Sequence, residues 1–293
     1  MLIVSMGAGL GNQMYEYAFY EYLKYRYPNQ EIKVDSRYAF PIAHNGIEVF
    51  DIFSLKAPMA TKEEVLSLAR KYMLNGEGFE KKSIVDKVMR KLKLYPSTMF
   101  VQRDFTEYYK AIEELDDGRS YYLYGPFANY YYFKDIEDNI KELFSFPEIT
   151  EQHNKRYEKA IVSSNSVSIH VRKGDYVKEK IQLTPIEFYK KAVEIILDKA
   201  GEAMFFIFTD DNKYARSLFP DEEHYIVVEG NRGKLSYRDM QLMSLCKHNI
   251  TCNSTFSFWG AYLNNNNKKI VVAPNLPVTR CKNAFVCDDW VIV

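Results

Sequence analysis

Three short polar segments in the second half of the chain carry residue types that could do chemistry. Residues 172–176 read Arg-Lys-Gly-Asp-Tyr, residues 209–211 read Thr-Asp-Asp, and residues 253–257 read Asn-Ser-Thr-Phe-Ser. Arginine grips phosphate oxygens through a planar fork, and hydroxyls beside the first N–H groups of a helix form a second anion site. This combination is suited to a nucleoside diphosphate, with Arg172 as the main phosphate ligand.

Carboxylates in the same half could select the base of such a nucleotide. Asp239, or Asp210, could accept hydrogen bonds from the N1–H and amino group of guanine, a donor edge that adenine lacks. His170 is a lone histidine at the end of an apolar run, where a positioning role is more typical than acid–base work. Each polar turn taken singly is more typical of a solvated loop, and only their coincidence at one sheet edge favours a site. The candidate donor-binding residues are His170, Arg172, Lys173, Asp210, Asp239, Asn253, Ser254, Thr255 and Phe256.

The elements that must position these turns alternate between strand and helix. Apolar runs predict strands at 167–171, 203–208, 225–228, 249–252 and 269–272. Periodic segments between them predict helices, the first of which is expected to begin with Thr184 as its cap and Pro185 at its first position. Such alternation predicts a parallel sheet with helices on both faces, and ligands of these sheets bind beyond the carboxyl ends of the strands.

The first half is less regular. Strands are predicted at 2–5, 32–35 and 121–124, and helices at 12–27, 62–74, 84–92 and 130–144. The turn at 7–12, Gly-Ala-Gly-Leu-Gly-Asn, resembles a dinucleotide fingerprint but has Asn12 where the last glycine belongs, and Asp35 alone does not rescue it. We predict two domains, residues 1–149 and 150–293.

Composition excludes several classes of protein. Lys and Arg number 39 against 39 Asp and Glu, so the net charge is zero and no global field attracts nucleic acid. The opening residues lack a basic segment, and no apolar run approaches the length of a membrane span, so we expect a soluble, cytoplasmic protein. The four cysteines form no C-x-x-C pair; we expect them reduced and not bound to zinc.

At this point the motifs resemble a known family. Residues 170–176, His-Val-Arg-Lys-Gly-Asp-Tyr, resemble the H-x-R-R-G-D-Y motif of inverting α-1,2-fucosyltransferases of the bacterial type. Residues 9–14, 208–211 and 253–260 match further segments of that family in the same order, whereas 62–119 contribute little. One departure is Lys173, which keeps the charge of the family's second arginine but loses its planar fork.

The resemblance implies an α/β enzyme of the GT-B type, with two domains. A Rossmann-like carboxyl-terminal domain would bind GDP-fucose, and the amino-terminal domain would shape the acceptor site. The implied reaction transfers fucose from GDP-fucose to the 2-hydroxyl of a terminal galactoside in a glycan, with inversion. Because the chain has no D-x-D triplet, we expect no metal and no other cofactor.

Three residues are predicted to carry the reaction. Arg172, aided by Lys173, would stabilise the departing diphosphate. Asn12 would hold the acceptor or the fucose by hydrogen bonds. The acceptor proton needs a base, for which Asp175 ranks slightly ahead of Asp35, although the neighbouring cation would weaken Asp175 as a base and it could instead orient Arg172.

Other functions remain open at this point. The chain could use another GDP-sugar or form another linkage, bind glycans without catalysis, or, least in keeping with its glycine pattern, bind a nicotinamide cofactor. The predicted partners are GDP-fucose and a galactose-terminated glycan, with no nucleic acid. The exact acceptor, the oligomeric state and a weak membrane-surface association are left open.

Overall fold

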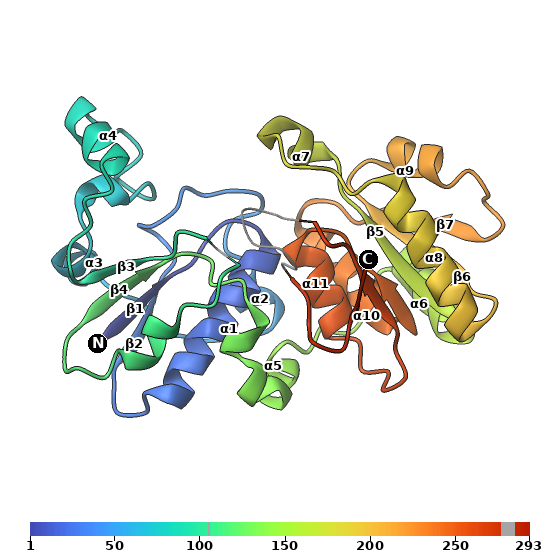
Figure 1. The fold of residues 1–293 in the computed structure, drawn as a ribbon, viewed down its shortest axis with the longest axis horizontal. Helices are drawn as coiled ribbons and strands as arrows, with labels where there is room; N and C mark the ends of the chain where they lie inside the picture. The colour runs from blue at the N-terminus through green and yellow to red at the C-terminus, as the bar shows by residue number, and fades with distance from the viewer. Residues whose placement is uncertain (105, 277–284) are drawn as a thin grey trace. The chain divides into compact units, whose positions relative to one another are not determined.

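Two parallel β-sheets, each with its own helices, make up the structure, a computed structural model that describes residues 1–104, 106–276 and 285–293 (Figure 1). The chain divides into a first unit, Met1–Ser145, and a second unit, Phe146–Val293. The boundary predicted at 149/150 falls in the same connection, between the last helix of the first unit and the first helix of the second. No helix within the described residues is long and apolar enough to cross a bilayer.

The sheet of the first unit has four parallel strands in the order β2-β1-β4-β3. These are β1 (Leu2–Ser5), β2 (Ile32–Asp35), β3 (Met99–Val101) and β4 (Tyr121–Tyr124). The register pairs Ser5 with Asp35, so the turns that follow β1 and β2 leave the sheet at the same edge. This edge carries the glycine-rich turn that the sequence singled out.

The helices of the first unit are one long helix and several short ones. They are α1 (Leu10–Arg26), α2 (Val49–Ile52), α3 (Lys62–Leu68), α4 (Ile84–Lys91) and α5 (Glu137–Leu143). Helix α1 is buried over most of its length, and its Phe19 ring stacks on Phe127 with 4.0 Å between centroids. Aromatic packing of this kind accounts for much of the unit's interior.

The single helix predicted over 130–144 is wrong. Two 3₁₀ turns, Tyr130–Tyr132 and Lys134–Ile136, precede α5 instead. The side chain of Asn129 accepts a hydrogen bond from the backbone N–H of Tyr131, which starts a tight turn. Aromatic side chains that are adjacent in this segment are both buried in the core. In a regular helix, adjacent side chains point in different directions, so one buried face could not hold both.

The second unit has a six-stranded parallel sheet in the order β10-β9-β8-β5-β6-β7. Its strands are β5 (Ser166–Val171), β6 (Met204–Thr209), β7 (Tyr225–Val227), β8 (His248–Ile250), β9 (Val271–Ala273) and β10 (Val291–Ile292). Its helices are α6 (Gln152–Ser163), α7 (Gly174–Glu179), α8 (Ile186–Ala200), α9 (Asn212–Leu218), α10 (Tyr237–Leu245) and α11 (Thr255–Tyr262). The predicted parallel sheet is confirmed.

Strand β5 lies near the centre of this sheet and is buried along its whole length. Its odd-numbered residues, such as Ile169, pack in one core with α8. Its even-numbered residues face the other side, where Ser168 accepts a hydrogen bond from Asn249, whose amide also donates to the Met243 carbonyl of α10. Because helices cover both faces, the first partly exposed side chain after β5 is that of Arg172, beyond the carboxyl end of the strand.

Two local predictions beside β5 need correction. Helix α8 begins at Ile186 with Pro185 as its cap residue, and the Thr184 hydroxyl donates to Asn253 Oδ1 at 3.2 Å instead of capping the helix. The segment after β5 is not a plain loop, because α7 begins at Gly174. Both changes arise from contacts with segments distant in the sequence.

Candidate functional site

The guanidinium of Arg172 lies just beyond the carboxyl end of β5. Its Nε donates to Asp175 Oδ1 at 2.9 Å, its Nη2 donates to Asp175 Oδ2 at 2.7 Å, and its Nε lies 3.2 Å from Asp210 Oδ2. Burial would lower the pKa of Arg172, but the hydrogen bond with Asp175 and the charge of Asp210 outweigh it and raise that pKa. Nη1 hydrogen-bonds to none of the described residues, so one edge of a permanent cation is fixed and the other is free.

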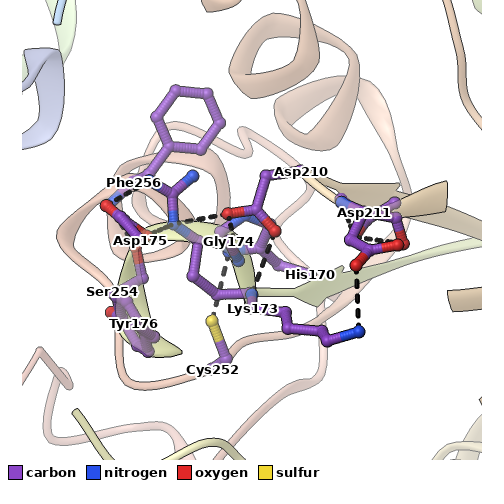
Figure 2. A network of polar contacts seen from close by, with 12 residues as sticks. His170, Lys173, Gly174, Asp175, Tyr176, Asp210, Asp211, Cys252, Ser254 and Phe256 are labelled. Atoms are coloured by element: carbon purple, nitrogen blue, oxygen red, sulfur yellow. Dashed lines mark hydrogen bonds and ion pairs between the residues drawn. The ribbon is translucent and has the colours of Figure 1, made fainter. Parts of the chain in front are cut away.

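Asp210 ties the end of β6 to the start of α7 (Figure 2). Its Oδ1 accepts from the backbone N–H of Lys173 at 2.9 Å, and its Oδ2 accepts from that of Gly174 at 3.1 Å. A Cβ on Gly174 would lie 3.0 Å from Asp210 Oδ2, so a glycine allows this close approach. Both carboxylate oxygens of Asp210 are thus engaged within the protein, which leaves Asp239 as the candidate for guanine.

Lys173 turns its ammonium away from Arg172. Its Nζ lies 3.0 Å from Asp211 Oδ2 and 4.5 Å from the centre of the Tyr214 ring, and Figure 2 shows the pair with Asp211. Asp211 also caps α9 by accepting from the Tyr214 N–H. The predicted assistance of Lys173 to Arg172 gains no support from this placement.

His170 is a neutral, buried residue beneath the site. Only 3% of it is exposed, and burial, with a smaller contribution from the charge of Arg172, lowers its pKa to about 3. Its Nδ1 lies 3.2 Å from the Sγ of Cys252, whose own pKa burial raises to about 12 (Figure 2). The ring of Phe256 lies 5.6 Å away, between centroids. The geometry supports positioning of the turn after β8 and leaves His170 uncharged.

The segment that opens α11 combines a cap with a structural link. Ser254 Oγ accepts from the backbone N–H of Phe256 at 3.3 Å and caps the helix, while half-buried Thr255 begins the first turn. Buried Asn253 holds the loop before α8, since its Nδ2 donates to the Gln182 carbonyl. Its own carbonyl accepts from the Tyr176 hydroxyl at 2.6 Å, which fixes α7 beside α11.

Asp239 belongs to a second hydrogen-bond network. Its Oδ1 accepts from Asn231 Nδ2 at 2.8 Å, and Asn231 in turn exchanges hydrogen bonds with Asn154. Burial raises the pKa of Asp239 to about 7. Arg232 joins this network to the end of β6 by donating to the carbonyl of Thr209 at 3.0 Å.

Sequence reasoning missed Asn231, Arg232 and Cys252. The sequence offered a signal for Arg232, because a basic residue a few places after the predicted strand 225–228 is a candidate for the polar edge of the sheet. Nothing in the sequence marked Asn231 or Cys252, whose partners lie 77 and 82 residues away.

The glycine-rich turn of the first unit presents Asn12 in the first turn of α1. Asn12 is partly exposed, and its side-chain amide has no hydrogen bond to any described residue. Its neighbour Gln13 is fully buried: Nε2 donates to the carbonyls of Ala8 and Gly46, and Oε1 accepts from the N–H groups of Glu48 and Val49. Gln13 therefore fixes the turn and leaves the Asn12 amide available for a ligand.

Asp35, the second carboxylate considered as a base, is buried at the end of β2. Its Oδ1 accepts from the backbone N–H groups of Arg37 and Tyr38, and its Oδ2 accepts from the Tyr122 hydroxyl at 2.5 Å. A cavity of about 430 Å³ adjoins this turn and is lined by residues 34–38 and 59–63.

Among the described residues, no cluster of His, Cys, Asp or Glu side chains suits a metal ion.

Each unit is a parallel α/β sheet whose strands end in polar turns, an arrangement that the GT-B class of glycosyltransferases shares with other nucleotide-binding folds. The chain belongs to glycosyl transferase family 11, whose model matches residues 1–293, and this confirms the family resemblance. It is 29% identical over 307 residues to the O-antigen biosynthesis glycosyltransferase WbnK of Escherichia coli, covering 98% of each chain. It is 28% identical over 286 residues to an alpha-1,2-colitosyltransferase of the same organism, covering 94% of this chain and 91% of the relative.

A solved structure supports the fold. A mutant of Arabidopsis thaliana FUT1 in complex with GDP superposes with a TM-score of 0.50 over 94% of this chain and 71% of the plant chain, at 13% sequence identity. The predicted GT-B fold class is therefore confirmed, and the protein is a glycosyltransferase.

Proposed function

We propose that this glycosyltransferase transfers fucose from GDP-fucose to the 2-hydroxyl of a terminal galactoside, with inversion at the sugar. The observation that carries the proposal is the Arg172 guanidinium, which Asp175 fixes along one edge and whose Nη1 hydrogen-bonds to none of the residues that the structure describes. The GDP bound to the plant structure of the same fold supports a GDP-sugar as donor. The second unit is the donor side of this proposal, and the first unit is the acceptor side.

In the proposed reaction the acceptor oxygen attacks the anomeric carbon from the face opposite the diphosphate. The bond from that carbon to the β-phosphate oxygen breaks, its electron pair stays on the diphosphate, and the acceptor hydroxyl releases its proton to solvent. The free Nη1 of Arg172 and the N–H groups that open α11 donate to the phosphate oxygens as their charge grows. Because Arg172 is held in place before the substrate arrives, little reorganisation is needed in the transition state.

We assign Asp175 to positioning Arg172. Both of its oxygens accept from the guanidinium, and a paired carboxylate beside a cation is a poor proton acceptor. Asp35 is no better suited as a base, since it is buried and each of its oxygens already accepts hydrogen bonds.

We assign Asn12 to the acceptor or the transferred sugar and Asp239 to guanine. The Asn12 amide, which hydrogen-bonds to no residue in the described part of the chain, can both donate to and accept from sugar hydroxyls. Ionised Asp239 would accept from the N1–H and amino group of guanine. Since its pKa is about 7, GDP should bind more weakly as the pH falls through that value.

A second GDP-sugar is a specific alternative. The relative named alpha-1,2-colitosyltransferase matches almost the whole chain, and colitose is a 3-deoxy form of fucose. The two donors differ by one hydroxyl, which a site built to hydrogen-bond that group would discriminate strongly.

The decisive experiment incubates the protein with GDP-fucose or GDP-colitose and a panel of galactose-terminated glycans, with and without a chelator. Mass analysis and linkage analysis of the products identify the donor and the bond formed. We expect an α-1,2-fucosylated product at the same rate with chelator. If products form with GDP-colitose but not with GDP-fucose, colitose is the sugar transferred. If glycans bind but no product forms, the protein is a noncatalytic glycan-binding protein.

A further inference from the structure

The segment 81–94 of the first unit, which contains α4, exposes an unusual amount of apolar surface. The exposed fractions are 81% for Ile84, 68% for Val85, 49% for Val88, 60% for Leu92 and 50% for Leu94. The first four recur at helical spacing and therefore share one face of α4 and its end. Figure 1 shows α4 projecting from the rest of the first unit.

Basic residues flank this apolar face. The segment holds six basic side chains, at 81, 82, 87, 90, 91 and 93, and a single acidic one, Asp86, in a chain whose net charge is zero. The lysines at 81, 87, 91 and 93 are exposed and form no ion pair with any described residue. The segment thus carries a local excess of five positive charges that the protein does not neutralise.

The opposite side of the segment is anchored to the protein. Arg90 donates through Nη1 to Asn75 Oδ1 at 2.9 Å and through Nη2 to the Met73 carbonyl at 3.3 Å. A capping box between Ser83 and Asp86 fixes the start of α4, and the lone acidic side chain is used there. The helix is therefore formed and oriented with its apolar face outward.

We propose that segment 81–94 is a docking surface for a lipid bilayer that contains anionic lipids. Its apolar face would lie in the boundary between headgroups and acyl chains, with the lysines against the lipid phosphates. A second copy of the chain fits less well, because a symmetric contact would bring two sets of unneutralised lysines together. An anionic bilayer supplies both the apolar layer and the opposite charge.

The test is co-sedimentation of the full chain with vesicles. We expect binding to vesicles of phosphatidylcholine mixed with phosphatidylglycerol, and little binding to phosphatidylcholine alone. Binding should weaken strongly at about 1 M salt, where the Debye length is about 3 Å. The assay does not depend on the proposed reaction, because it measures partition and not turnover.

Two pairs of variants separate this segment from the rest of the surface. Val88→Ser with Leu92→Ser, and Lys87→Glu with Lys91→Glu, should each reduce the partition coefficient about tenfold or more. The matched controls are Val162→Ser with Leu197→Ser, at sites 63% and 41% exposed, and Lys190→Glu with Lys191→Glu on α8. The controls should bind as the unmodified protein does.

A fluorescence readout tests insertion directly. Both native tryptophans, Trp259 and Trp290, are buried, so a Val88→Trp variant reports mainly on α4. Its emission should shift to the blue with anionic vesicles. Absence of binding by the unmodified protein, or equal losses in the control variants, would overturn the proposal. So would self-association in sedimentation velocity that the Val88→Ser with Leu92→Ser variant abolishes while vesicle binding persists.

Discussion

Arg172 combines a fixed edge with a free one, and this predicts how its replacement acts. Arg172→Ala should lower kcat about 10³-fold, because a preorganised donor to the leaving group is lost. Arg172→Lys should lower it about 10²-fold, since the charge remains without the planar fork. Lys173→Met is the comparison, and its effect should stay below about tenfold because the Lys173 ammonium pairs with Asp211. Steady-state kinetics and circular dichroism of each variant check this, and equal losses at both positions would contradict it.

The pH dependence of the reaction rate in Asp175 variants shows whether Asp175 positions Arg172 or acts as the base. Asp175→Asn keeps one oxygen to accept from Arg172 Nε, so kcat should fall only about tenfold, whereas Asp175→Ala should cost more. The acid limb of the pH–rate profile should survive in the asparagine variant. Its disappearance would show that Asp175 takes the acceptor proton.

Asp239 makes stability depend on pH in a direction that can be measured. Burial raises its folded pKa to about 7, while the unfolded chain titrates near the ordinary value, so the fold loses stability as the pH rises from about 4 to about 7. Asp239→Asn removes this penalty and should raise the free energy of unfolding by up to about 4 kcal/mol at pH 8, and by much less at pH 4. Urea unfolding of both proteins at the two pH values measures it. The same gain at both would mean that Asp239 does not titrate as described.

At the scale of elements, the turn between β1 and α1 holds two adjacent residues with different roles: Gln13 stabilises the turn, and Asn12 is assigned to binding. Gln13→Ala leaves buried N–H and carbonyl groups without partners and should lower the free energy of unfolding by about 2–4 kcal/mol. Asn12→Ala removes no hydrogen bond of the described structure and should change that free energy by less than about 0.5 kcal/mol while lowering turnover. Denaturant unfolding paired with kinetics tests both. Loss of stability in Asn12→Ala would remove its assigned role.

Most strands of this fold could be predicted because each is a short apolar run between turn residues. Strands β1, β2 and β4 match their predicted ranges. Strand β3 was missed, since Met99–Val101 is short and gains its strand geometry only by pairing with β4. Helix α7 was missed for a similar reason, because Asp210 holds its first backbone N–H groups from a different strand.

A buried cation that sequence analysis did not single out joins the start of the second unit to α10. Arg238 of α10 donates to the carbonyls of Pro147 and Glu148 at 2.8 Å and lies 3.1 Å from Glu151, so it holds the start of the unit against its interior. Arg238→Met should lower the free energy of unfolding by about 3–5 kcal/mol, because Glu151 loses its partner. The exposed pair of Arg216 with Glu229 is the control, and Arg216→Met should cost less than about 1 kcal/mol.

Calorimetry can assign the Arg238 effect to one unit. If the two units unfold in separate transitions, only the transition of the second unit should move. A uniform shift of the whole profile would mean that the units unfold together, and no shift would contradict the role given to Arg238.

The sequence by itself determined the parallel α/β class and the family, because apolar periodicity and motif order are properties of neighbouring residues, and it predicted a phosphate-binding role for Arg172. Only the tertiary structure decided how those residues are used. It brought Asp175 and Asp210 to one edge of Arg172, sent Lys173 to Asp211, and buried Asp35. The physical reason is that strand order sets the distances between side chains far apart in the chain, and those distances decide which charges pair and which stay free for a substrate.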